Sequence, residues 1–193
     1  MTLLVDHQIR RLAERGMIKD FYEEPYQPGL SAGLTSCGYD ARLGYGFYKI
    51  RGYAMDDEIN PLYGVGEMDM VEFSLAADDM FILGPGEFVL GHTMETFNMP
   101  EDVAAVCWGK STYARCGIHV NVTPLEPGWC GQVTLEIFNQ SPRYVLLHPG
   151  RGICQFQFHH LAERPEITYA DKGGKYQSQT GVTFAMGAND DQG

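Results

Sequence analysis

The residues best suited to chemistry lie in one stretch near the middle of the chain. It places two cations and two hydroxyl groups directly after a glycine, at Lys110, Ser111, Thr112 and Arg115. Cations and hydroxyl donors that follow a glycine closely are the groups that bind a phosphate ester. The stretch therefore predicts a binding site for a small phosphorylated molecule.

A carboxylate follows in the same part of the chain. Glu136 lies in a run in which Val133, Leu135 and Ile137 are apolar. Apolar residues at alternate positions predict a strand with one buried face, which places Glu136 on the other face. A carboxylate on a rigid strand near cations and hydroxyl groups can act as a general base. An acid in such a strand is more often simply solvent-facing, and these residues alone leave both readings open.

The surrounding sequence predicts a mainly β fold that positions these groups. Charged residues make up only 20% of the chain while aromatic residues reach 12%, and there are 23 glycines. From Met70 onward, apolar runs alternate with Gly and Pro turns, which is typical of a β-barrel or jelly roll. Residues 6–15 predict one short amphipathic helix, with Asp6 as its cap and Gly16 at its end. We expect a single domain over residues 1–193, with a disordered tail at 188–193.

Three other segments carry expectations of their own. Asp40 and Arg42 share one face of an extended segment, so they could pair, serve a neighbouring subunit or form a buried hydrogen-bonded corner. Residues 51–69 are acidic and predict a solvated loop. Residues 168–183 are polar and rich in glycine, which predicts a segment that stays loose until a ligand orders it.

The overall charge and the cysteine pattern exclude several classes of protein. The formal net charge of -11 argues against general binding to nucleic acid, although a local basic cluster suffices for a small polyanion. The five cysteines form no C-x-x-C pair, so we expect reduced and mostly buried thiols. The six histidines show no metal-ligand spacing. Since no apolar run reaches membrane-spanning length, we expect a soluble, cytoplasmic protein without membrane contact.

Several of these runs together resemble one enzyme family. The runs GKSTYARCGI (109–118), VNVTPLEP (120–127) and VTLE (133–136) are similar to those of the dCTP deaminases, in the bacterial and viral branch with lysine at the first basic position. GYDAR (38–42) and YADKGGKYQSQTGVT (169–183) extend the similarity to most of the chain. The family shares its fold with trimeric dUTPases.

The resemblance implies a fold, an assembly and a reaction. The fold would be a distorted β-barrel of the dUTPase-like type, assembled as a homotrimer whose active sites are completed by neighbouring subunits. The reaction would be hydrolysis of dCTP to dUTP and ammonia in pyrimidine deoxynucleotide metabolism. For a virus-encoded protein the compartment would be the host cytoplasm.

The resemblance also assigns roles to residues. Glu136 stands at the general acid/base position, and Ser111 and Arg115 stand where the family fixes the base and the attacking water. Thr134 and Leu135 fall beside the sugar and base. The other positions implied to contact the nucleotide are Lys110, Thr112, Tyr113 and Ala114 around the phosphates, and Gln155, Tyr169, Lys175 and Gln179.

The sequence lacks the signatures of the zinc-dependent deaminases. Those enzymes hold a zinc-bound water with H-x-E and P-C-x-x-C motifs, and neither is present. We therefore expect no zinc and no catalytic metal, with Glu136 moving the protons. Magnesium is expected only as the ion carried by the nucleotide triphosphate.

Three alternatives remain open at the level of sequence. The chain differs from many relatives at Gly128, at Gln132 and in the run 139–143. These differences leave the preferred base open, so a modified cytosine deoxynucleotide is the first alternative substrate. Glu126 lies near the position of an acid in dUTPases, so pyrophosphate hydrolysis is a second alternative. A regulatory protein that binds a nucleotide without turnover is the third.

Overall fold

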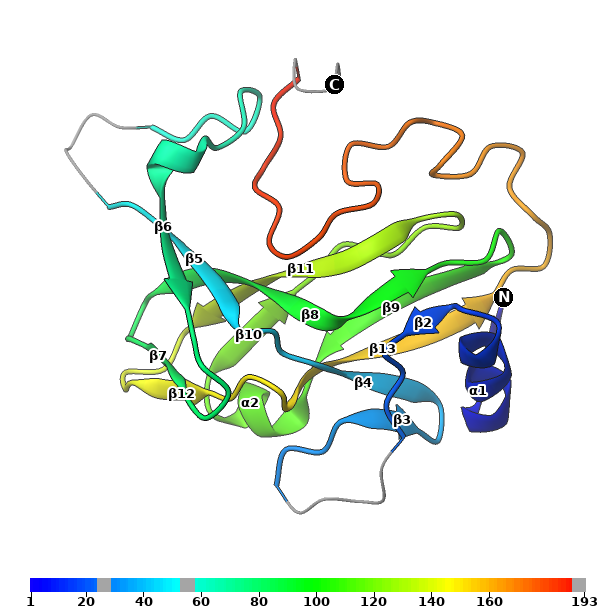
Figure 1. Cartoon of the computed structure of the whole chain (residues 1–193), viewed down its shortest axis with the longest axis horizontal. Coiled ribbons are helices and arrows are strands. Elements are labelled where there is room, and N and C mark those ends of the chain that lie inside the picture. The colour runs from blue at the N-terminus through cyan, green and yellow to red at the C-terminus, as the bar shows by residue number, and fades with distance from the viewer. Residues whose placement is uncertain (24–28, 53–57, 189–193) are drawn as a thin grey trace.

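The structure is a computed structural model. It describes residues 1–23, 29–52 and 58–188. Except for Ala188, the expected tail at 188–193 lies outside these residues, as do Asp56 and Asp57 of the expected acidic loop. The prediction of a mainly β protein in the form of a distorted barrel, with a short N-terminal helix, is confirmed (Figure 1).

Two larger sheets and one small sheet make up the fold. The five-stranded sheet contains β1 (Thr2–Leu3), β13 (Gly152–His160), β4 (Gly38–Arg42) and β3 (Gly33–Thr35), with β9 (Val103–Gly109) paired to β13. The six-stranded sheet contains β10 (Ile118–Asn121), β11 (Cys130–Asn139), β8 (Phe88–Asn98), β5 (Gly46–Ile50) and β6 (Met70–Ser74), with β2 (Ile18–Lys19) paired to β8. The two-stranded sheet contains β12 (Val145–Leu147) and β7 (Phe81–Leu83). The helical elements are α1 (Asp6–Glu14), α2 (Ser111–Arg115) and the 3-10 turn η1 (Glu67–Asp69).

The predicted N-terminal helix is present as α1. The predicted cap, Asp6, is the first residue of the helix, and the N-cap is Val5. The side chain of Gln8 accepts a hydrogen bond from the Val5 N–H at 3.1 Å. The sequence places Ile9, Leu12 and Ala13 on one face of this helix; Ile9 and Ala13 are buried and Leu12 is half-buried. Gly16 follows the helix with a φ of 96°, a left-handed conformation that favours glycine.

Strand β11 follows the alternation that the sequence predicts. Val133, Leu135 and Ile137 are buried in the core, so the intervening side chains, including Glu136, lie on the other face. A register irregularity between Gln132 and Thr134 interrupts the pairing with β8. The alternation therefore sets the direction in which Glu136 points.

Asp40 and Arg42 take different partners. Arg42 pairs with the fully buried Glu95 of β8, with 2.8 Å between Nε and Oε1. Asp40 is also buried, and its carboxylate pairs with Lys110. Of the three sequence-based alternatives, the structure therefore contains the buried hydrogen-bonded corner.

The polar segment after β13 lies against β11 as a strap (Figure 1, orange to red). We call residues 168–188 the C-terminal strap. The N–H of Ser178 donates to the carbonyl of Cys130 at 2.7 Å, and Gly181 donates to the side chain of Gln132 at 2.7 Å. The sequence predicted a loose segment because it has few apolar side chains to bury. Hydrogen bonds to β11 hold the segment instead, and these could not be read from the sequence.

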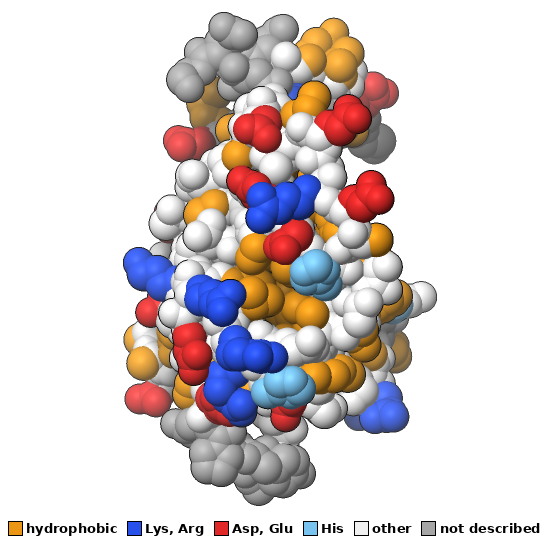
Figure 2. All heavy atoms as spheres, turned by 90° about the vertical axis from the view of Figure 1, so that its right-hand side faces the viewer, with side chains coloured by type: hydrophobic (Ala, Val, Ile, Leu, Met, Phe, Trp, Pro, Cys, Tyr) orange, Lys and Arg blue, Asp and Glu red, His pale blue; other side chains and the backbone are white. Residues whose placement is uncertain are grey.

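The remaining expectations concern the surface and the thiols. All five cysteines are free, but only Cys154 is buried, so the expectation of mostly buried thiols is wrong. Within the described ranges, the structure contains no helix long and apolar enough to cross a membrane. On the side of the molecule that Figure 2 shows, Lys and Arg side chains alternate with Asp and Glu side chains around an apolar area.

Candidate active site

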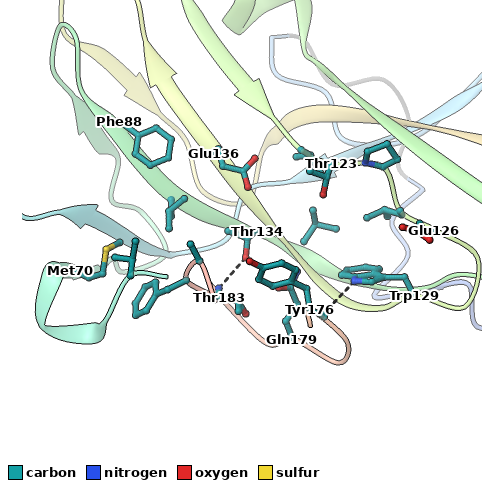
Figure 3. A pocket seen from close by; sticks show the side chains of 18 of the residues that line it. Met70, Phe88, Thr123, Glu126, Trp129, Thr134, Glu136, Tyr176, Gln179 and Thr183 are labelled. Atoms are coloured by element: carbon teal, nitrogen blue, oxygen red, sulfur yellow. Dashed lines mark hydrogen bonds between the residues drawn. The ribbon is translucent and has the colours of Figure 1, made fainter. Parts of the chain in front are cut away.

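The face of β11 that carries Glu136 forms one wall of a pocket of about 800 Å³. The C-terminal strap forms the opposite wall, with Gln179 and Thr183 among its contributions (Figure 3). Thr134 joins the two walls, because its hydroxyl accepts a hydrogen bond from the Thr183 N–H at 3.0 Å. The volume lies within the range of about 300–1,000 Å³ that is typical of sites for small ligands.

The pocket is mainly apolar around the carboxylate. Phe88 and Leu90 come from β8, and Leu90 lies directly across the strand pair from Glu136. Met70 and Phe88 lie at one end of the pocket and Glu126 and Trp129 at the other (Figure 3). A planar base would therefore find apolar contacts beside a single acid.

Burial raises the pKa of Glu136, because the pocket removes water from its charged form. Two weaker effects lower the pKa again: a hydrogen bond from Asn121 and one from the residue's own backbone. A carboxylate with a raised pKa accepts and returns protons closer to neutral pH than an exposed one does. Glu136 therefore has the electrostatic properties of a general acid and base.

Four of the sequence-predicted residues line this pocket: Thr134, Glu136, Tyr169 and Gln179. The Tyr169 hydroxyl also accepts a hydrogen bond from the Tyr176 N–H at 3.0 Å, within the C-terminal strap. The structure therefore brings together residues that are separated by more than thirty positions in the sequence.

The predicted phosphate-binding run lies elsewhere. Gly109 ends β9, and residues 111–115 form α2, which lies on the other side of the view from the C-terminal strap (Figure 1). Among the described residues that line the pocket, none belongs to the run 110–115. Ser111, Thr112, Ala114 and Arg115 are exposed. The acid and the predicted cations of the site are thus separated within one chain.

Two of the predicted contact residues have buried side chains. Tyr113 is 4% exposed and accepts a hydrogen bond from the His148 N–H at 3.1 Å. Leu135 is fully buried in the core. A ligand could reach these two residues only through their backbone atoms. Their side chains pack in the core.

Lys110 and Gln155 belong to a polar cluster around Asp40. The Lys110 ammonium pairs with the Asp40 carboxylate and donates to the Ser31 hydroxyl at 3.0 Å. Gln155 donates to the other Asp40 oxygen at 3.0 Å. In this arrangement Lys110 is neutralised by Asp40, so a phosphate would have to compete with a buried carboxylate for it.

Lys175 and Glu126 each have a polar partner within the chain. The Lys175 ammonium donates to the carbonyl of Gly187 at 2.9 Å, inside the C-terminal strap. Glu126 lines the pocket and lies 3.3 Å from the ammonium of Lys172. Among the described lining residues there is no Lys or Arg, so the pocket of one chain provides acids and no cations.

Sequence reasoning missed several residues that line the pocket or contact Glu136. Asn121 of β10 donates to Glu136 Oε2 at 3.1 Å, and Tyr176 and Phe184 line the pocket. Asn121 lies inside the quoted run 120–127, but its contact depends on the register of β10 against β11, which sequence does not provide. Within the described residues, no group of three or more His, Cys, Asp or Glu side chains is arranged to hold a metal ion.

Comparison with known proteins gives results of two kinds. The sequence model described as dCTP deaminase-like matches residues 3–161. The dCTP deaminase of Erythrobacter litoralis is 47% identical over 186 residues, covering 95% of this chain and 98% of that protein. The dCTP deaminase of Gluconobacter oxydans is 45% identical over 185 residues, with the same two coverages of 95% and 98%.

The structural comparison supports the same fold. The crystal structure of 2'-deoxycytidine 5'-triphosphate deaminase from Agrobacterium tumefaciens matches 82% of this chain with a TM-score of 0.60 and 24% sequence identity. The match spans 47% of that longer chain, so this chain corresponds to about half of its length.

Proposed function

Because the chain belongs to the dCTP deaminase-like family, we propose that it hydrolyses dCTP to dUTP and ammonia, acting as a single domain in the cytoplasm. The observation that carries the proposal is the half-buried Glu136, whose raised pKa and place in an apolar pocket suit a general acid and base. Relatives that share nearly half of their residues with this chain over almost its full length support the same reaction.

The proposed chemistry needs one group that moves protons. Glu136 takes a proton from water as the water oxygen bonds to C4 of cytosine, and it delivers this proton to the ring nitrogen N3. It then takes the second proton from the same oxygen as the C4=O bond forms and delivers it to the departing 4-amino group. The C4–N bond breaks, ammonia leaves and the base becomes uracil. One positioned acid/base group contributes a factor of about 10² to 10⁴, and the remainder comes from positioning and from stabilisation of charge.

The charges in the pocket support a site shared between subunits. A nucleotide triphosphate carries several negative charges, whereas the described pocket lining contributes Glu126 and Glu136 and no cation. Arg115 is exposed on α2 and is not among the described residues that line the pocket of its own chain. We therefore propose a homotrimer in which α2 of one copy, with Ser111 and Arg115, completes the pocket of the next.

A mixing experiment tests the shared site. Glu136→Gln and Arg115→Ala should each be nearly inactive alone, but co-expression should restore activity at sites that combine Glu136 of one variant with Arg115 of the other. With random assembly about a quarter of the sites are of this kind. The matched control pairs Glu136→Gln with the double variant carrying both changes, which can form no complete site. Failure of the first mixture to exceed this control would show that the site lies within one chain.

The reaction itself has a direct test. Purified protein with magnesium and dCTP should release ammonia and convert the cytosine absorbance spectrum to that of uracil. The magnesium ion would be held by the triphosphate oxygens and water, because Mg²⁺ prefers oxygen ligands and few protein groups. Binding of dCTP without any ammonia would instead favour the regulatory alternative.

The same assay separates the two remaining alternatives. Phe88, Leu90 and Met70 are among the apolar residues of the pocket lining, and the substrate panel should include 5-methyl-dCTP and 5-hydroxymethyl-dCTP, which test whether the pocket accepts a base modified at C5. Glu126, the acid on which the alternative of pyrophosphate hydrolysis rests, lies in the pocket lining, so pyrophosphate should be measured as well. Pyrophosphate released in step with ammonia would assign both reactions to this site.

A further inference from the structure

We propose that Asn121 is the positioning residue for Glu136, an inference that rests on the proposed function. Its side-chain amide holds one carboxylate oxygen as an acceptor and leaves the other to carry the proton during the reaction. Asn121 lies on β10 directly across from Glu136 on β11, and its Nδ2 donates to Oε2 at 3.1 Å. The two strands thus fix both partners of the bond.

The other neighbours of the carboxylate cannot replace this contact. Leu90 lies across from Glu136 on the β8 side and is apolar. The second hydrogen bond to the carboxylate comes from the backbone of Glu136 itself. Asn121 is therefore the one side chain, in the part of the chain that the structure describes, for which a hydrogen bond to Glu136 is found.

The bond has a chemical consequence for proton transfer. An amide N–H donates to a carboxylate oxygen whether the other oxygen is ionised or protonated, because the unprotonated oxygen remains an acceptor in both states. With Oε2 held in this way, the proton taken from water resides on Oε1. The same oxygen can then return the proton without rotation of the carboxyl group.

The bond also offsets part of the cost of burying the charge. Burial raises the pKa of Glu136 and the amide of Asn121 lowers it again. The titratable groups on this face of the sheet include His119 on β10, across from Phe138, His92 on β8, across from Thr134, and Tyr48 on β5, across from Leu90; the pocket adds Glu126, Tyr169 and Tyr176. Since no cation is among the described lining residues, Asn121 is the side chain that favours the ionised form.

Substitution of Asn121 should alter proton transfer and leave the fold intact. Asn121 is exposed, so Asn121→Ala removes little packing and should unfold at a temperature close to that of the original protein. Turnover at neutral pH should fall about tenfold with KM nearly unchanged, because a hydrogen bond to a charged group is lost. The acid limb of the pH–rate profile should move to higher pH by about one unit.

Two further variants make the result specific. Asn121→Asp keeps the shape but places a second carboxylate beside Glu136, so the acid limb should move further upward than in Asn121→Ala. His119→Ala, on the same side of the same strand, should keep the original profile. A variant profile that is lower at every pH but not displaced would overturn the positioning role. Absence of ammonia release by the unmodified protein would instead overturn the proposed function, so the two failures are distinguishable.

Discussion

Replacement of Glu136 by Gln is expected to reduce the turnover of dCTP by at least about 10² while nucleotide binding is retained. Gln has nearly the same shape and still accepts a hydrogen bond from Asn121, but it cannot take a proton from water. The measurement is ammonia release under saturating dCTP together with the dissociation constant of the nucleotide. A Gln variant with turnover near that of the original protein would remove Glu136 from its assigned role.

Glu126→Gln provides the matched control for this prediction. Glu126 is the other acid among the described lining residues, but it lies at the far end of the pocket and pairs with Lys172 at the surface. Ammonia release should therefore change much less than in Glu136→Gln. A larger loss in Glu126→Gln would place the essential carboxylate on the loop before Trp129 and not on β11.

The raised pKa of Glu136 also fixes the direction of the pH dependence. The general base must be ionised, so the rate should fall as the pH drops through the pKa of Glu136 in the folded protein. Because burial raises this pKa above the ordinary value of 4.5, the loss should begin at a higher pH than an exposed glutamate would give.

The strands that carry the site could be predicted from the sequence because their pattern is local. Val133, Leu135 and Ile137 alternate with polar residues, and this alternation alone placed Glu136 on the face away from the core. Likewise, the amphipathic pattern of residues 6–15 predicted α1. Local periodicity is sufficient wherever one face of an element is buried.

The opposite wall of the pocket could not be predicted in this way. The C-terminal strap is held by hydrogen bonds to side chains such as Gln132 and Thr134, and these bonds leave no hydrophobic periodicity in the sequence. The contact between Asn121 and Glu136 depends on strand register, which is a non-local property. A segment with few apolar side chains can therefore be held in place by hydrogen bonds to polar partners.

Glu95 is a buried acid of β8 whose position in the strand pattern was overlooked in the sequence. Val89, Thr93, Glu95 and Phe97 share the buried face of the strand, so Glu95 lies in the same alternation as apolar residues. A charged residue at a buried position needs a partner of opposite charge. Arg42 was singled out by its position, but only the fold shows that its partner is Glu95.

Replacement of Glu95 by Ala is expected to be strongly destabilising. The carboxylate is fully buried and accepts hydrogen bonds from the Tyr39 hydroxyl at 3.0 Å, from the Arg42 N–H at 3.0 Å and from Arg42 Nε at 2.8 Å. Its removal leaves a largely buried guanidinium and a buried hydroxyl without their acceptor. Breaking such a pair costs about 3–5 kcal/mol of unfolding free energy. Urea denaturation at one fixed protein concentration measures the loss, since the stability of the proposed homotrimer would depend on concentration.

Two controls separate the lost pair from a general effect of removing an acid. Glu101→Ala breaks an exposed ion pair with Arg164, whose atoms lie 3.0 Å apart, and solvent screening should leave its stability close to that of the original protein. Glu95→Gln keeps an acceptor for Tyr39 and Arg42 but removes the charge, so its stability should fall between the other two. If Glu95→Ala and Glu101→Ala unfolded at similar urea concentrations, the corner formed by β4 and β8 would not stabilise the fold. Because β8 also pairs with β11 along its length, a weakened corner should reduce ammonia release only at temperatures where the protein begins to unfold.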